Sequence, residues 1–150
     1  MTIPIGWPRP YHQVMTISDE KYVASTTYRK SGAAMTTPTW IVALDGGQVG
    51  FWTSSASGKY KRLRNNHRIT LQPSDARGRV KAAPPVDGTA ELVTSGAEFD
   101  AIKRQVRAKY GAMVQISRFF NTLGHIGKGK FPYGDVGVVI NLSEPASPTA

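Results

Sequence analysis

The chain contains no cysteine and few acidic residues. Its 150 residues include 10 Asp and Glu against 19 Lys and Arg, which gives a formal net charge of +9. Without cysteine there is no disulfide framework, thiolate metal site, iron–sulfur cluster or cysteine nucleophile. Long hydrophobic runs are also missing, since no window approaches the ~18 apolar residues of a membrane helix. We therefore expect no integral membrane segment, and the lack of disulfides is compatible with a cytoplasmic protein.

The two ends of the chain differ in composition from its middle. Residues 1–17 are proline-rich, and they show no charged region followed by an apolar stretch, so we expect no secretory signal. Residues 143–150 are similarly rich in proline and small residues. The length fits one domain. We predict a single domain over residues 1–150, with an extended arm at 1–17 and a flexible tail at 143–150.

The basic residues fall into two blocks. One runs from Lys59 to Lys81 with Asp75 as its only acid, and the other runs from Lys103 to Lys130 with none. Clusters of one sign indicate a polyanionic partner, which leaves nucleic acid, an anionic membrane surface or a phosphorylated small molecule. Nucleic acid is disfavoured, because aromatic residues are not interleaved with the basic run in the manner of RNA-binding motifs and no helix-turn-helix pattern is present. The widely separated histidines lack metal-ligand spacing, so no metal site is expected.

Most of the chain is patterned as β-strands. Strands are predicted at residues 22–29, 33–44, 48–53, 67–72, 86–93 and 136–142, with a further short one possible at 78–81. Pro38 indicates an edge, a bulge or a bend, and Gly88 indicates a bulge. Short loops after the first two strands favour an antiparallel meander of the first three. The mostly apolar last strand is predicted to lie centrally in the sheet.

Helices are predicted at residues 59–66 and 95–110. Ser57 is the expected N-cap of the first, and Ser95 with Glu98 forms the expected capping box of the second. An apolar stripe in the second helix ends before Gly111, and residues 113–123 form another amphipathic stretch. Strands followed by helices and a closing strand do not give a doubly wound sheet. The predicted fold is mainly β, a closed or half-closed antiparallel barrel of about six to seven strands with appended helices.

The segment from Thr53 to Arg62 has the composition of an anion site. Small residues permit close approach of the backbone, hydroxyls supply hydrogen bonds, and a helix N-terminus favours negative charge. Lys59 and Lys61 add positive charge, although the P-loop spacing is missing. A phosphate site and an ordinary capped turn both remain open for this segment.

Two segments, residues 22–40 with Thr-Thr-Pro-Thr-Trp and residues 51–79, resemble the flavin and deazaflavin oxidoreductase superfamily, which is related to pyridoxamine 5'-phosphate oxidase. Within the second segment, Lys-Tyr-Lys-Arg-Leu-Arg-Asn-Asn at 59–66 and Asp-Ala-Arg-Gly-Arg at 75–79 are most similar to the B branch of probable coenzyme F420-dependent enzymes from mycobacteria and other actinobacteria. The resemblance covers roughly residues 20 to 142. It implies a split β-barrel of the FMN-binding type.

The resemblance also implies which residues bind the cofactor. Residues near the tricyclic ring would be Thr37, Pro38 and Thr39. Residues near the phosphate and ribityl chain would be Trp52, Thr53, Ser57, Lys59 and Lys61. Arg79 would approach a cofactor bound mainly to the other chain of a homodimer, whose cofactor sites lie at the subunit interface. No catalytic residue is assigned, because a flavin or deazaflavin ring itself performs hydride transfer.

The implied function is that of a cytoplasmic F420-dependent oxidoreductase acting on a small unsaturated or conjugated substrate. The long basic groove favours F420, which carries a phosphodiester and a polyglutamate tail, over FMN. Two alternatives keep the fold: an FMN-dependent oxidase or reductase, and a protein that binds F420 or flavin without turnover.

Overall fold

The computed structural model describes residues 17–111, 113 and 134–143. Seven strands carry the fold: β1 (Tyr22–Tyr28), β2 (Ala34–Thr39), β3 (Val42–Ala43), β4 (Val49–Thr53), β5 (Arg68–Ser74), β6 (Val86–Val93) and β7 (Val136–Leu142). The described ranges also contain the α-helices α2 (Gly58–Asn65) and α3 (Ala97–Tyr110) and the short 3-10 turns η1 (Ile17–Asp19) and η2 (Asp45–Gly47). No helix in the described ranges is long and apolar enough to cross a membrane.

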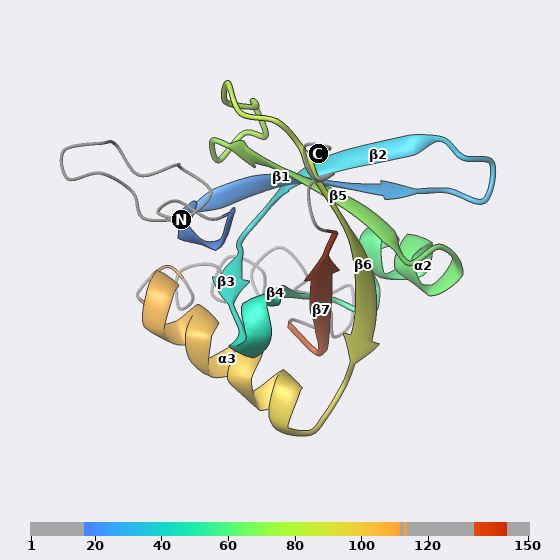
Figure 1. The fold of residues 1–150 in the computed structure, drawn as a ribbon. Helices are drawn as coiled ribbons and strands as arrows, with labels where there is room; N and C mark the ends of the chain where they lie inside the picture. The colour runs from blue at the N-terminus through green and yellow to red at the C-terminus, as the bar shows by residue number, and fades with distance from the viewer. Residues whose placement is uncertain (1–16, 112, 114–133, 144–150) are drawn as a thin grey trace, which may run out of the picture.

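The strands form one antiparallel sheet in the order β2-β1-β5-β6-β7-β4-β3. Its two edge strands, β2 and β3, are consecutive in sequence and are joined only by Trp40 and Ile41. A two-residue link spans roughly 10 Å, so the sheet must curve until its two edges approach each other. The result is the predicted half-barrel, with α2 beneath the long β1–β2 hairpin and α3 on the outside near β3 (Figure 1).

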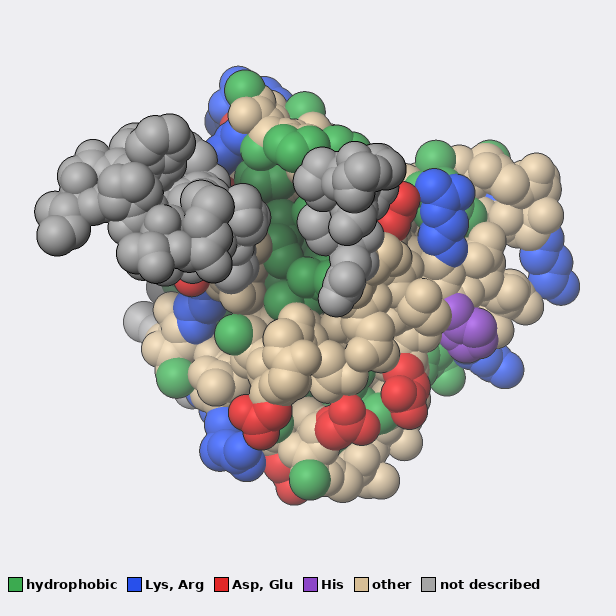
Figure 2. Space-filling view, viewed as in Figure 1, with side chains coloured by type: hydrophobic (Ala, Val, Ile, Leu, Met, Phe, Trp, Pro, Cys, Tyr) green, Lys and Arg blue, Asp and Glu red, His purple; other side chains and the backbone are tan. Residues whose placement is uncertain are grey.

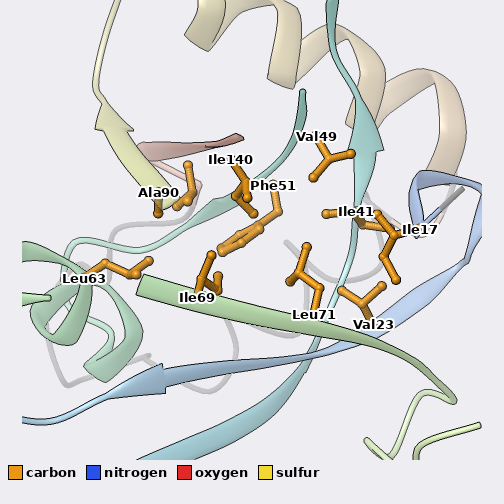
Figure 3. Packing of buried hydrophobic residues seen from close by; sticks show 11 residues of the cluster. Ile17, Val23, Ile41, Val49, Phe51, Leu63, Ile69, Leu71, Ala90 and Ile140 are labelled. Carbon is orange, nitrogen blue, oxygen red and sulfur yellow. The ribbon is translucent and has the colours of Figure 1, made fainter. Parts of the chain in front are cut away.

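The main core fills the interior of this half-barrel. Phe51 on β4 is fully buried and points toward Ile69 on β5, although strands β6 and β7 lie between β4 and β5 in the sheet (Figure 3). Leu63 from α2 closes one end of the same cluster, and Ile140 from β7 lines its wall. The core therefore joins opposite parts of the curved sheet, and the burial of these side chains favours the curvature.

A second apolar cluster lies between α3 and the outside of the sheet. The predicted stripe of α3 is buried, with Ile102 and Val106 fully so, and it packs with Val42 and Val139. Gly137 permits this approach, since a Cβ there would come within 2.9 Å of Ile102 Cδ1. Because β7 faces the barrel interior on one side and α3 on the other, its apolar run is buried on both faces. Its predicted central position is confirmed.

The early strands pair antiparallel as predicted, β1 with β2 and β3 with β4. The segment 33–44 is two strands rather than one, however, so β2 and β3 lie at opposite edges of the sheet and the predicted continuous meander is interrupted. The break falls at Trp40 and Ile41, while Pro38 lies within β2 opposite Ala24. Since β2 is an edge strand, its proline is tolerated there, which confirms the expectation of an edge.

Three further details of the local prediction need comment. Gly88 is not a bulge, because the registers through it are continuous; a Cβ there would instead meet Ile140 Cγ2 at 2.7 Å. The predicted capping box is wrong: α3 starts after Gly96, whose φ is 95°, and no side chain caps it. The short strand near residue 80 is reduced to a single bridge between Ser74 and Val80. The predictions for residues 1–16, 114–133 and 144–150 lie outside the described residues.

Candidate functional site

An open pocket of about 430 Å³ lies where β1, β2, β4 and α2 meet. Its lining residues come from segments far apart in the sequence: Tyr22, Pro38, Thr39, Trp40, Trp52, Lys59, Ala76 and Met113. Three of the eight are aromatic and one is cationic. The volume falls within the ~300–1,000 Å³ of small-molecule and cofactor sites, which are mostly apolar with a few placed polar groups.

A row of hydroxyl groups lies beside the pocket on one face of β1 and β2. Residues two apart in a strand share a face, and Ser25 on β1 pairs with Thr37 on β2. Ser25 Oγ and Thr39 Oγ1 share a hydrogen bond of 2.6 Å. The Thr37 hydroxyl is buried and has no hydrogen-bond partner in the described part of the chain. This face is therefore polar where a barrel strand would ordinarily present apolar side chains.

Lys59 extends from the first turn of α2 onto this polar face. Its Nζ donates a 2.6 Å hydrogen bond to Thr39 Oγ1 and lies 5.1 Å from the centre of the Phe51 ring. Burial, together with the positive charge of Arg62, lowers the pKa of Lys59 to about 8. Among residues 17–111, 113 and 134–143, no carboxylate forms an ion pair with it. The ammonium is thus positively charged at neutral pH without a balancing anion.

Two arginines continue the positive charge along β1. Arg62, one helical turn after Lys59, donates from Nε to Thr27 Oγ1 at 2.6 Å. Burial and the charge of Arg29 lower the pKa of Arg62. Like Lys59, both arginines lack an ion pair with any described carboxylate. Lys59, Arg62 and Arg29 together form what we call the basic row, which runs from the pocket toward the tip of the β1–β2 hairpin.

Charged side chains of both signs lie on the face shown in Figure 2. Basic side chains project on the side that carries the β1–β2 hairpin, and several acidic side chains gather at the lower end, where a basic side chain lies beside them. A recessed strip of hydrophobic side chains is visible in the upper middle of the same view.

The loop before α2 is held by hydrogen bonds within it and to Asp135, which precedes β7. Asp135 accepts bonds from the Ser55 backbone N–H at 2.8 Å and from Ser55 Oγ at 2.6 Å. Ser57 is the N-cap, as predicted, and accepts from the Tyr60 N–H at 3.1 Å. The hydroxyls of Thr53 and Ser57 share a 3.0 Å bond. Several groups expected to face an anion therefore already have partners within the protein.

The structure brings together some of the residues that the resemblance implies and separates others. Pro38, Thr39, Trp52 and Lys59 line the pocket, and Thr37 lies on β2 two residues before Thr39. Thr53 is the last residue of β4, next to Trp52, and Ser57 is the N-cap of α2. Lys61 is exposed on α2 outside the pocket lining.

Arg79 is also distant from the pocket lining within this chain. Its side chain is 73% exposed and forms a 2.6 Å ion pair with Asp75. The backbone N–H of Arg79 also bonds the Asp75 carboxylate and lowers its pKa. In the described ranges, no three His, Asp or Glu side chains gather in a group that could hold a metal ion.

Sequence reasoning missed three aromatic or thioether members of the pocket wall: Tyr22, Trp40 and Met113. Tyr22 begins β1, Trp40 crosses between sheet edges, and Met113 follows α3. No local signal joins these three positions, because only the curvature of the sheet and the docking of α3 bring them to one wall. Arg62 was counted within the basic block, but its bond to Thr27 depends on the placement of α2 under β1.

Comparison with solved structures finds the same fold in proteins of low sequence identity. A structure named F420 reductase is 18% identical, with 91% of this chain and 96% of that chain covered and a TM-score of 0.56. A conserved hypothetical protein from Mycobacterium tuberculosis is 13% identical, with 97% and 87% covered and a TM-score of 0.62. A pyridoxamine 5'-phosphate oxidase-related, FMN-binding protein from Nostoc punctiforme is 11% identical, with 87% and 74% covered and a TM-score of 0.52.

Sequence comparison identifies the family. No curated protein matches the chain. The family model described as Pyridoxamine 5'-phosphate oxidase, in contrast, matches residues 12–132. That range includes β1 to β6, both helices and every residue of the pocket lining. The protein therefore belongs to the pyridoxamine 5'-phosphate oxidase family, and it has the split-barrel fold of that family.

Proposed function

We propose that this protein is an oxidoreductase that binds coenzyme F420 in the pocket between β2, β4 and α2. The observation that carries the proposal is the Lys59 ammonium, which is hydrogen-bonded to Thr39 and balanced by no carboxylate in the described ranges. A half-buried cation of this kind favours binding of an anionic group, because the ligand supplies the missing charge.

The residues present fit such a cofactor. The pocket volume suits it, and the buried Thr37 hydroxyl retains hydrogen-bonding capacity for a polar ring edge. Lys59 would hold an anionic group, while Trp40 and Trp52 would cover apolar ring surface and exclude water. When bound, a deazaflavin or flavin supplies the hydride-transfer chemistry. Pro38 and Thr39 would orient the ring, partly through the β2 backbone.

The basic row supports F420 over FMN. Ser25 and Thr27 lie on one face of β1, about 7 Å apart along the strand. Lys59 bonds Thr39, whose hydroxyl bonds that of Ser25, Arg62 bonds Thr27, and Arg29 follows the end of β1, so the three cations succeed each other along the strand. An extended polyanion can contact all three, whereas the single phosphate of FMN needs fewer. FMN remains the second candidate, because a neighbouring fold belongs to a protein named as FMN-binding. Binding without turnover remains the third.

Assembly and location form part of the same proposal. We propose that the protein is a cytoplasmic homodimer with cofactor sites at the subunit interface, acting on a small unsaturated or conjugated substrate. An exposed Arg79 fits an approach to a site on the partner subunit, since it lies outside the pocket lining of its own chain. Sedimentation equilibrium measures the assembly, and a monomer at micromolar concentration contradicts it.

The test is to titrate the protein with F420 and with FMN in parallel and to measure binding as quenching of the cofactor's fluorescence. We expect saturable binding of F420 and weaker binding of FMN. Lys59→Met should weaken binding by about 10-fold or more, as for loss of a charge-assisted hydrogen bond. Arg64→Met is the matched control, because it removes one charge from an exposed position on the same helix. Tighter binding of FMN selects the second candidate, and binding of neither cofactor overturns the proposal.

A further inference from the structure

The link between the two sheet edges depends on the last two residues of α3. Trp40 and Ile41 cross from β2 to β3, where no neighbouring strand pairs with them, yet Ile41 is fully buried. Buried backbone N–H and C=O groups need partners. Tyr110 and Lys109 supply them: the Ile41 N–H donates to Tyr110 Oη at 2.9 Å, and Lys109 Nζ donates to the Ile41 carbonyl at 2.6 Å.

The same two side chains also hold the segment that precedes β1. Tyr110 Oη donates to the Lys21 carbonyl at 2.7 Å. Lys109 Nζ donates to the Ser18 and Glu20 carbonyls at 2.7 and 2.6 Å. One hydroxyl thus bridges Lys21 and Ile41, the immediate neighbours of Tyr22 and Trp40 in the chain. Tyr22 and Trp40 are two of the three aromatic residues that line the pocket.

Tyr110 also contacts Trp40 directly. Their rings stack with centroids 4.4 Å apart and an interplanar angle of 9°. Tyr110 is only 4% exposed, and burial raises its pKa to about 12, so the hydroxyl keeps its proton at ordinary pH. The indole therefore lies between the buried phenol ring and the pocket. Such a stack restricts the tilt of the indole, which sets the shape of that wall.

We propose that Tyr110 is a positioning residue for the pocket: with Lys109, it fixes Trp40 and Tyr22 as one aromatic wall and thereby sets ligand affinity. The part concerning affinity rests on the proposed function. Tyr110 lies in a helix outside the barrel and does not line the pocket itself, so its effect passes through Trp40.

A reporter of Trp40 tests the positioning without any ligand. Substituting Trp7→Phe and Trp52→Phe leaves Trp40 as the single tryptophan. In this background, Tyr110→Leu should raise acrylamide quenching and shift the emission to longer wavelength. Tyr110→Phe, which keeps the stacked ring, should give a smaller change. Unchanged Trp40 emission in folded Tyr110→Leu protein overturns the proposal.

Ligand affinity, measured with all three tryptophans present, tests the consequence. Tyr110→Leu should weaken F420 or FMN binding by about 3- to 10-fold, the worth of an aromatic pair, and Tyr110→Phe should restore part of the loss. Ile102→Val is the control, because Ile102 is buried on the same helix but packs toward Gly50 and Gly137. If Ile102→Val weakens cofactor binding as much as Tyr110→Leu does, and the two variants are equally stable, the proposal is overturned. If the unsubstituted protein binds neither cofactor, the proposed function fails, and the Trp40 reporter alone decides the positioning.

Discussion

Lys59 couples ligand binding to protonation at the level of a single side chain. Its pKa of about 8 is below the ordinary value of 10.5, because burial and Arg62 disfavour the charged form. Only that charged form attracts an anion. An anionic ligand should therefore bind together with a proton as the pH approaches and passes the pKa of Lys59. Arginine in its place stays charged throughout.

Binding of F420 or FMN should weaken as the pH rises from about 7 to about 9.5, with the decline centred above pH 8, since ligand binding raises the pKa of Lys59. Lys59→Arg should remove most of this dependence, and Lys59→Met should give weak, nearly pH-independent binding. Fluorescence titration at each pH measures the effect. If the affinity of Lys59→Arg falls with pH as much as that of the unsubstituted protein, the pH dependence belongs to another group.

The same shift affects the stability of the ligand-free protein. A lysine whose folded-state pKa lies below its unfolded-state pKa destabilises the fold at low pH, and this penalty disappears as the pH rises from about 8 to about 10.5. Lys59→Met should therefore raise the free energy of unfolding at pH 7 by about 1–2 kcal/mol. Urea unfolding should show the gain shrinking across that pH interval. A destabilised Met variant at pH 7 contradicts this account.

At the level of elements, α3 packs on a part of the sheet that contains two glycines. A Cβ at Gly137 on β7 would come within 2.9 Å of both Ile102 Cδ1 and Phe99 Cδ1, and one at Gly50 on β4 would meet Ile102 Cγ1 at 3.2 Å. Gly137 faces Trp52 across the β4–β7 pair. The distance between helix and sheet is therefore set by the absence of side chains at these positions.

Gly137→Ala should destabilise the fold by about 1–3 kcal/mol through overpacking. The control is Gly58→Ala at the start of α2, where the new Cβ would meet only the guanidinium end of Arg62. There the higher helix propensity of alanine should offset the contact. Thermal or urea unfolding distinguishes the two variants. A stable Gly137→Ala protein would show that α3 can shift away from β7 without loss.

The elements themselves could largely be predicted from the sequence, but only the pairings across short loops could be predicted with them. Alternation and β-branched residues identify β1, β5, β6 and β7, and an apolar stripe identifies α3. The continuous meander was wrong because two short loops cannot show that Trp40 and Ile41 cross between opposite sheet edges. The capping box failed because Gly96, with φ of 95°, takes the N-cap position in place of Ser95. Local sequence patterns do not show which strands become neighbours across the sheet.

The candidate site shows the same division. Lys59, Thr39, Pro38 and Trp52 could be predicted by carrying family positions onto this chain, and the structure places all four around one pocket. Tyr22, Trp40 and Met113 could not, since each reaches the wall through tertiary packing. Arg79 could be placed only in its loop, because its bond to Asp75 closes a local turn. A role for Arg79 across a dimer interface stays a prediction.

The whole molecule carries a net charge of +9 with little internal compensation on the polar face of β1. The ion pairs in the described ranges involve Arg68, Arg79, Lys81 and Lys103. None involves the basic row. Long-range attraction should therefore contribute to binding of any anionic ligand, and dissolved salt should screen it.

Raising the salt concentration from about 0.05 M to about 0.5 M should weaken F420 binding more steeply than FMN binding. The reason is that the extended anionic tail contacts more of the basic row than one phosphate does. Arg62→Gln should reduce the salt dependence for F420 and change it little for FMN. Isothermal titration calorimetry at several salt concentrations gives, for each cofactor, the slope of log affinity against log salt concentration. Equal slopes for the two cofactors would argue against contact between the tail and Arg62.

The pairing of β4 has a consequence for synthesis of the chain. Val49 pairs with Ile140, so β4 leaves the ribosome long before β7, its inner neighbour in the sheet. At about 5–20 residues per second, the delay is on the order of ten seconds. During that time β4 has only the two-residue strand β3 beside it, and an unpaired strand edge is a site of aggregation. Newly made chains therefore complete the half-barrel only after β7 has left the ribosome, and a nascent chain stalled before β7 is the form that most needs protection by chaperones.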